Sequence, residues 1–178
     1  LVDPAVVLRT IRPTFPSEPL GGILEGLAFD GDGLWVTAVR QNLSGNMLTR
    51  VCPVTGNRIA PFDAGPLGAA GKVNIPGTVA QGLLYEAPSP GGGHGYLWHS
   101  DVQAKKIWKL DIGRLFDADP TNDNDLAVAE FSVPFGPKGM DWMGGKIWVA
   151  SPHNGIYEFE PQTGATVKLF STPLWNLD

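Results

Sequence analysis

The sequence has little of what disulfide, nucleic-acid or membrane chemistry would require. Its single cysteine, Cys52, cannot form an intramolecular disulfide, and no candidate metal ligands surround it in the sequence. The net charge is −5 and no basic run occurs, so the chain has no electrostatic surface for nucleic acid. No apolar stretch approaches the length of a membrane span. We therefore expect a soluble protein whose partners include neither nucleic acid nor a membrane.

Charge is also scarce, whereas turn-forming residues are abundant. Charged residues make up 17% of the chain, but its 178 residues include 23 glycines and 16 prolines. Six tryptophans and a hydrophobic fraction of 43% argue against disorder. The length suffices for one core, so we expect a single domain over residues 1–178. This composition favours many short strands joined by tight turns.

Three similar units follow one another along the chain. Each opens on a glycine, and these three residues, Gly26, Gly82 and Gly139, lie 56 and 57 residues apart. A second run centred on a tryptophan follows each opening run, at residues 34–37, 97–100 and 147–150. The third alternating runs are 48–51, 107–110 and 156–159, and the fourth are 58–62, 127–131 and 166–170. Four short strands in a repeat of this length are typical of a β-propeller blade.

We therefore predict an all-β fold, a β-propeller with three four-stranded blades in this chain. The blades are expected at about residues 22–63, 79–132 and 136–171, with an extra outer strand over 5–11. A β-sandwich would not explain three matching units. The tryptophan of each second strand is expected to fill the space between neighbouring blades.

Three blades are too few to close a ring, since closed propellers typically have four to eight. The exposed faces of the first and last blades would then form an interface. We expect a homodimer that closes a six-bladed ring, because two-fold dimers are the commonest oligomers. A longer natural chain, or pairing with a different half-propeller, are the alternatives.

The third unit resembles a known family. Residues 136–151, GPKGMDWMGGKIWVAS, and 156–164, IYEFEPQTG, are similar to the gluconolactonase/regucalcin (senescence marker protein) family. Residues 25–37 and 81–111 resemble it less strongly. Streptogramin lyases and strictosidine-synthase-like proteins share these blade signatures, so the resemblance is stronger for fold than for activity.

The resemblance implies a six-bladed propeller that hydrolyses lactones or related esters with a divalent cation on its axis. In the family a Glu, an Asn and an Asp hold this cation, each just before a blade-opening glycine. The equivalent residues here are Glu25, Gln81 and Lys138. An ammonium at the third position would repel a metal. Glu25 alone remains a carboxylate ligand for a cation such as Ca²⁺, Mn²⁺ or Zn²⁺, and no other cofactor is expected.

A lysine and a carboxylate in a concave mouth form a candidate acid/base or anion-binding pair, and Gln81 would contact the same ligand. The alternative is an ion pair between Glu25 and Lys138 that only satisfies the mouth. The leading hypothesis is a hydrolase of small lactones or esters at the axial mouth. A non-catalytic module that binds a small ligand or carbohydrate, or a streptogramin-type lyase, are the alternatives.

Four further features are weaker candidates. Asp101 ends a second strand and either contacts a ligand or caps a turn. His153, in a turn, is the best histidine candidate for a general base; His94 and His99 add no metal-ligand spacing. Residues 117–125 form either a calcium loop or a solvated hairpin.

The chain begins with Leu1 rather than Met, which a removed export signal would explain, so a secreted or periplasmic location is slightly favoured over a cytoplasmic one.

Overall fold

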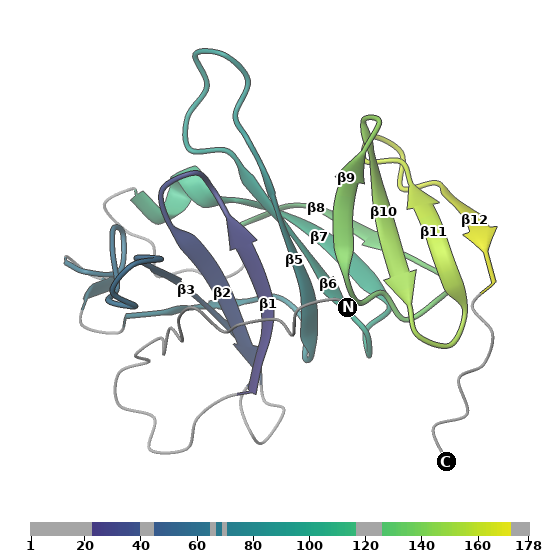
Figure 1. Cartoon of the computed structure of the whole chain (residues 1–178), viewed down its shortest axis with the longest axis horizontal. Helices are drawn as coiled ribbons and strands as arrows, with labels where there is room; N and C mark the ends of the chain where they lie inside the picture. The colour runs from purple at the N-terminus through teal and green to yellow at the C-terminus, as the bar shows by residue number, and fades with distance from the viewer. Residues whose placement is uncertain (1–22, 40–44, 65–66, 69–70, 117–125, 172–178) are drawn as a thin grey trace, which may run out of the picture.

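The computed structural model describes residues 23–39, 45–64, 67–68, 71–116 and 126–171. The described part of the chain forms three four-stranded antiparallel sheets (Figure 1). The first sheet contains β1 (Ile23–Phe29), β2 (Leu34–Val39), β3 (Asn46–Val51) and β4 (Val73–Ile75). The second contains β5 (Ala80–Glu86), β6 (Tyr96–Asp101), β7 (Lys106–Asp111) and β8 (Ala127–Ser132). The third contains β9 (Met140–Met143), β10 (Lys146–Ser151), β11 (Gly155–Phe159) and β12 (Thr166–Phe170).

In each sheet the strands follow chain order, as the repeat predicted. A short 3₁₀ helix, η1 (Ile112–Phe116), follows β7. No helix in the described ranges is long and apolar enough to cross a membrane. The extra strand expected over 5–11 and the acidic run 117–125 lie outside the described residues.

The fourth strand of the first unit is not where the sequence predicted it. It was expected at residues 58–62, but β4 is Val73–Ile75, paired with β3. Arg58 forms only an isolated bridge with Val51. Pro61 has no N–H to donate to a ladder, so a strand cannot continue through this run. The chain instead buries Phe62 and reaches the sheet edge some ten residues later.

Two hydrophobic cores join the three sheets face to face. The core between the first and second sheets includes Trp35, Leu48, Leu83 and Trp108. The core between the second and third includes Trp98, Ile147, Val149 and Phe159. Trp35 and Trp98 are 0% and 1% exposed. The second-strand tryptophans of the first two sheets therefore fill the space between neighbours, as predicted.

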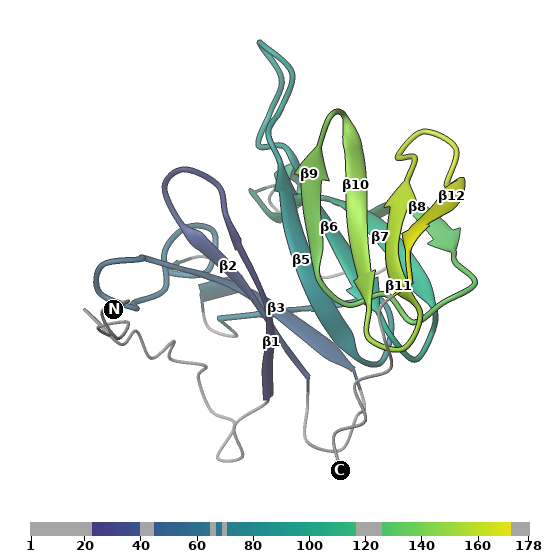
Figure 2. The same cartoon turned by 45° about the vertical axis from the view of Figure 1, so that its right-hand side comes forward.

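The inner strands β1, β5 and β9 lie side by side (Figure 2). Their approach is so close that the opening glycines are needed. A Cβ on Gly26 would lie 2.9 Å from the Leu83 Cβ, and a Cβ on Gly82 only 2.0 Å from the Lys138 carbonyl oxygen. Any larger residue would push the inner strands apart. The glycine period of the sequence thus reflects sheet-to-sheet packing around an axis.

Candidate functional site

The residues before the three opening glycines lie at β-bulges, which occur at the same position in each of the three inner strands. The register of β1 shifts between Leu24 and Gly26, which leaves Glu25 as the inserted residue. The register of β5 shifts between Ala80 and Leu83, the stretch that contains Gln81. A bulge re-aims the side chains around it and commonly occurs beside functional sites.

The third inner strand repeats this arrangement just before β9. The Lys138 N–H donates to the Ala150 carbonyl at 2.8 Å, and the Ala150 N–H donates to the Gly139 carbonyl at 2.8 Å. Two residues therefore oppose one, as in the other two sheets. Because β1 neighbours β5 and β5 neighbours β9, the same register position recurs on three adjacent strands. Glu25, Gln81 and Lys138 thus share one end of the inner strands.

A serine links the second of these positions to the third. The Ser100 hydroxyl accepts a hydrogen bond from the Gly82 N–H at 2.9 Å and donates one to the Lys138 carbonyl at 2.7 Å. It is fully buried, so these bonds hold the backbone of the two inner strands together. Thr37 occupies the equivalent place in β2, and its buried hydroxyl has no partner among the described residues. The repeat places Ser100 beside the site, although the sequence analysis did not single it out.

The chemistry of these three positions does not fit a divalent cation. Glu25 and Gln81 are half-buried and Lys138 is exposed. The donor set is one carboxylate, one amide and one ammonium, whereas calcium and similar ions need several oxygen ligands. Within the described ranges, no group of three or more His, Cys, Asp or Glu side chains could hold a metal ion.

The Asp101 carboxylate accepts hydrogen bonds from the backbone of the two turns around it. Its Oδ2 accepts hydrogen bonds from the Thr78 and Val79 N–H groups, and its Oδ1 accepts them from those of Gln103 and Ala104. Burial alone would raise the pKa of this carboxyl, but the four N–H groups together lower it. This geometry favours the turn-capping role over ligand contact.

The three histidines lie in different surroundings. His99 is fully buried in β6 and stacks on Trp108, with ring centroids 4.8 Å apart and planes 6° apart. Desolvation lowers its pKa to about 4, although the Asp101 carboxylate and the backbone of Ser100 and Pro76 pull it upward. His153 is exposed in the turn between β10 and β11. His94 lies in the β5–β6 hairpin and stacks on Phe116 at 3.8 Å.

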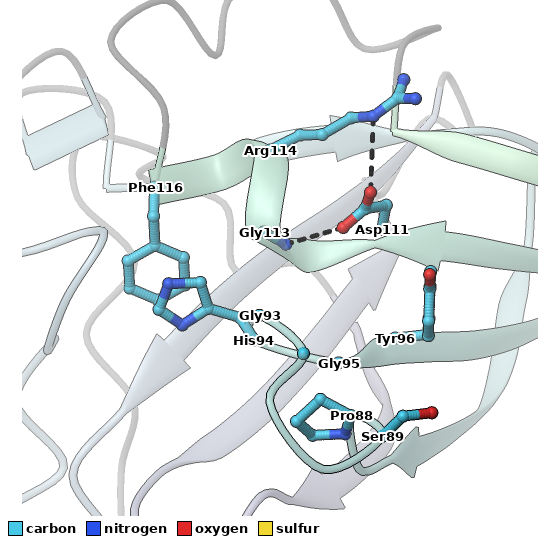
Figure 3. Close-up of a pocket in the computed structure, with 11 residues that line it drawn as sticks. Pro88, Ser89, Gly93, His94, Gly95, Tyr96, Asp111, Gly113, Arg114 and Phe116 are labelled. Atoms are coloured by element: carbon cyan, nitrogen blue, oxygen red, sulfur yellow. Dashed lines mark hydrogen bonds and ion pairs between the residues drawn. The ribbon is translucent and has the colours of Figure 1, made fainter.

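Two pockets lie near the other end of the inner strands. One has a volume of about 550 Å³ and lies between the β5–β6 hairpin and η1 (Figure 3). Its lining includes Tyr96, Asp111, Arg114 and the stacked rings of His94 and Phe116. None of the five predicted site residues, Glu25, Gln81, Asp101, Lys138 and His153, lines it.

The neighbouring pocket, of about 360 Å³, shares His94 and Phe116 and reaches the first sheet. Its wall contains a buried ion pair, in which the Arg50 Nε lies 2.8 Å from the Asp30 Oδ2. The Trp35 indole N–H donates to the same oxygen at 2.6 Å. Burial would raise the pKa of Asp30, but these and two backbone hydrogen bonds lower it to about 2. The charged wall is thus fixed in place rather than available to a proton-transfer step.

Comparison with known proteins is informative for the fold alone. No protein-family model and no curated protein matches the sequence. Among solved structures, the glutaminyl cyclase of Myxococcus xanthus matches with a TM-score of 0.57 and 10% identity, over 85% of this chain and 52% of that one. The computationally designed Ika4 protein matches with a TM-score of 0.53 and 8% identity, over 90% of this chain and 79% of that one.

These neighbours are propeller-like proteins. The chain forms three blades of a β-propeller. It spans about half the length of the glutaminyl cyclase chain. The solved structures also include a protein from Bacteroides uniformis, provisionally assigned as a 6-phosphogluconolactonase, with a TM-score of 0.42 and 15% identity, over 82% of this chain and 40% of that one. At 10% and 8% identity, the likeness to the glutaminyl cyclase and to Ika4 carries the propeller fold and no activity.

Proposed function

We propose that this propeller hydrolyses small lactones or esters at the mouth formed by the starts of its inner strands. One observation carries the proposal: Glu25, Gln81 and Lys138 occupy the same bulged position on three adjacent inner strands. A carboxylate, an amide and an ammonium are then available within one end of the propeller. We also propose that two copies of the chain share this mouth, because three blades leave the ring open.

The proposed reaction needs only the side chains of the chain itself. The Glu25 carboxylate takes a proton from water as the water oxygen bonds to the carbonyl carbon of the substrate. The Lys138 ammonium and the Gln81 amide N–H stabilise the negative charge that develops on the carbonyl oxygen. The carbon–oxygen bond of the ester then breaks, and the leaving alkoxide receives the proton from Glu25. The products are a carboxylic acid and an alcohol, joined in one molecule when the substrate is a lactone.

The test is a screen of small lactones and aryl esters, run with chelator and again with added calcium, manganese or zinc. We expect hydrolysis that survives chelation, and a loss of about 100-fold in kcat for Glu25→Gln and for Lys138→Ala. Glu158→Gln and Lys168→Ala, which change a glutamate and a lysine of the third blade away from the mouth, serve as matched controls. Variants at Glu25 and Lys138 that equal the wild type would overturn the axial site, and activity that vanishes with chelator would overturn the metal-free reaction.

The pocket beside η1 favours a second candidate function, the binding of a small ligand such as a carbohydrate without catalysis. Its volume of about 550 Å³ lies in the range of small-molecule sites. The rings of Tyr96 and Phe116 offer flat apolar surface, and Asp111 offers a hydrogen-bond acceptor beside it. Calorimetric titration with mono- and disaccharides tests this candidate. Tyr96→Ala should weaken any binding at least tenfold, whereas Lys138→Ala should leave it unchanged.

A further inference from the structure

The pocket of about 360 Å³ between the first and second blades combines a charged wall with aromatic rings. Its volume lies within the range of small-molecule sites. We call it the interblade pocket and define it by six of its lining residues: Asp30, Asp32 and Arg50 from the first blade, and Tyr85, His94 and Phe116 from the second.

The charges that line this pocket do not cancel. The Asp30 carboxylate and the Arg50 guanidinium form an ion pair whose side chains are only 9% and 10% exposed. Asp32 adds a second carboxylate, whose Oδ2 lies 3.2 Å from the Arg50 Nη2, and its side chain is 86% exposed. Two carboxylates therefore face one guanidinium. With the His94 imidazole neutral, the described lining of the pocket carries one negative charge in excess.

The strongest hydrogen-bond donors of the interblade pocket are already in use. Arg50 donates four hydrogen bonds, to the two carboxylates of the wall and to the Ala60 carbonyl. The Tyr85 hydroxyl donates to the His94 carbonyl at 3.2 Å. An acceptor is free by contrast, since no described residue donates to the Asp32 Oδ1. The pocket thus suits a ligand that brings its own donors, and an anionic ligand would meet repulsion.

Aromatic surface lines the pocket beside this wall. The His94 and Phe116 rings stack with centroids 3.8 Å apart, so each ring has one face covered by the other and one face that this contact leaves open (Figure 3). Tyr85 adds a third ring. Burial raises the pKa of Tyr85, and the Asp30 carboxylate raises it further although Arg50 opposes this, so the phenol stays uncharged at neutral pH. The faces of neutral aromatic rings attract cations.

We propose that the interblade pocket binds a small organic cation, a protonated amine with an apolar body. The ammonium group donates to the free oxygen of the Asp32 carboxylate, and the apolar body packs against the Tyr85 and Phe116 rings. A neutral ligand of the same shape lacks the attraction to the excess carboxylate. The site does not depend on the hydrolysis proposed above, because no residue of the mouth lines this pocket.

Three probes that share one ring and differ in charge test the proposal. They are benzylamine, a cation at neutral pH, benzyl alcohol, which is uncharged, and benzoate, an anion. Calorimetric titration of the protein at low salt should give saturable binding of benzylamine, about fivefold tighter than that of benzyl alcohol, and no binding of benzoate. The affinity for benzylamine should fall as salt is added, because the exposed Asp32 carboxylate is screened.

Two variants test the groups that would hold the amine. Asp32→Asn removes the excess charge and leaves the buried ion pair in place, so it should weaken benzylamine binding about fivefold and leave benzyl alcohol binding unchanged. Phe116→Leu keeps an apolar side chain and removes an aromatic face, so it should reduce the preference for benzylamine over benzyl alcohol. Asp141→Asn, at an exposed aspartate of β9 outside the pocket, is the matched control and should bind as the wild type does.

Chemical shifts of the backbone amides locate the bound amine. On titration with benzylamine, the largest changes should occur at Asp32, Gly93 and His94. Changes confined to Tyr96 and Arg114 would place the amine in the neighbouring pocket beside η1 and would overturn the assignment.

Three further results would overturn the proposal. They are benzyl alcohol or benzoate that binds as tightly as benzylamine, benzylamine binding that Asp32→Asn and Phe116→Leu both leave unchanged, and the lack of saturable benzylamine binding at tens of millimolar. Lys138→Ala separates this site from the mouth, because it should leave benzylamine binding unchanged. Amine binding by a protein without hydrolytic activity would leave the pocket standing and sink only the proposed hydrolysis.

Discussion

The buried His99 should make folding stability fall on mild acidification. Its side chain is fully buried against Trp108, and burial lowers its pKa from 6.5 to about 4. The unfolded chain binds a proton on this residue near pH 6.5, whereas the folded chain does not until about pH 4. Acidification therefore lowers the free energy of unfolding between about pH 6.5 and pH 4. Below about pH 4 this loss is complete and no longer changes with pH.

The size of the effect follows from the two pKa values. The difference between a pKa of 6.5 and one of about 4 corresponds to a total loss of about 3 kcal/mol in the free energy of unfolding. About 2 kcal/mol of this loss falls between pH 7.5 and pH 5. The interval ends at pH 5 because the carboxylates of the unfolded chain are still largely ionised there. Urea unfolding at the two pH values measures the loss in the wild type and in His99→Phe.

His99→Phe is the informative variant, because neither ring nitrogen makes a well-formed hydrogen bond with a described residue. Phenylalanine keeps the stacking on Trp108 and removes the titrating group. Any packing cost of the larger ring is the same at both pH values and cancels in the comparison. The variant should lose about 2 kcal/mol less than the wild type on going to pH 5. The exposed His153→Gln should behave as the wild type, and equal losses in all three proteins would refute the reasoning.

Four further substitutions test how the blades are held. Asp101→Asn should cost about 1–3 kcal/mol in urea unfolding, because an amide cannot accept all four backbone N–H groups; full stability would show that these bonds contribute nothing. Gly82→Ala should lower the melting temperature sharply, since its Cβ would meet the Lys138 carbonyl, while Gly139→Ala should not. Asp30→Ala should cost about 3 kcal/mol, because it leaves the buried Arg50 guanidinium with the exposed Asp32 carboxylate as its remaining ionic partner, and the Asp30–Arg50 pair should weaken in the wild type only as the pH falls from 3.8 towards 2.

Much of the fold was accessible from the repeat. The short run that begins at each opening glycine predicted the inner strands β1, β5 and β9, and the tryptophans marked β2, β6 and β10. The failure at β4 has a local cause. Residues 58–62 alternate like a strand, but Pro61 cannot donate to a ladder, and the edge of the sheet is closed by a three-residue strand that no pattern marks.

The candidate site was only partly accessible. The family resemblance pointed to Glu25, Gln81 and Lys138 through their position before the glycines, and the structure adds the bulges of the inner strands at which these three residues lie. Asp101 could not be assigned from sequence, because a strand-end aspartate binds a ligand or a turn with the same local pattern. Four backbone donors from two separate loops favour the turn, and their convergence is a tertiary property.

The sequence by itself determined the blade: strand spacing, hairpin turns and the glycine that lets inner strands approach are all local features. Only the tertiary structure decided how each of these elements is used. The space beside Gly26 and Gly82 is filled by the following blade, whereas no described residue beyond its own chain neighbours fills the space beside Gly139, although the three glycines are alike in sequence. Trp35 and Trp98 are buried while Trp148 is partly exposed, for the same reason. Burial depends on what lies beyond a residue in space, which the local sequence of one repeat does not specify.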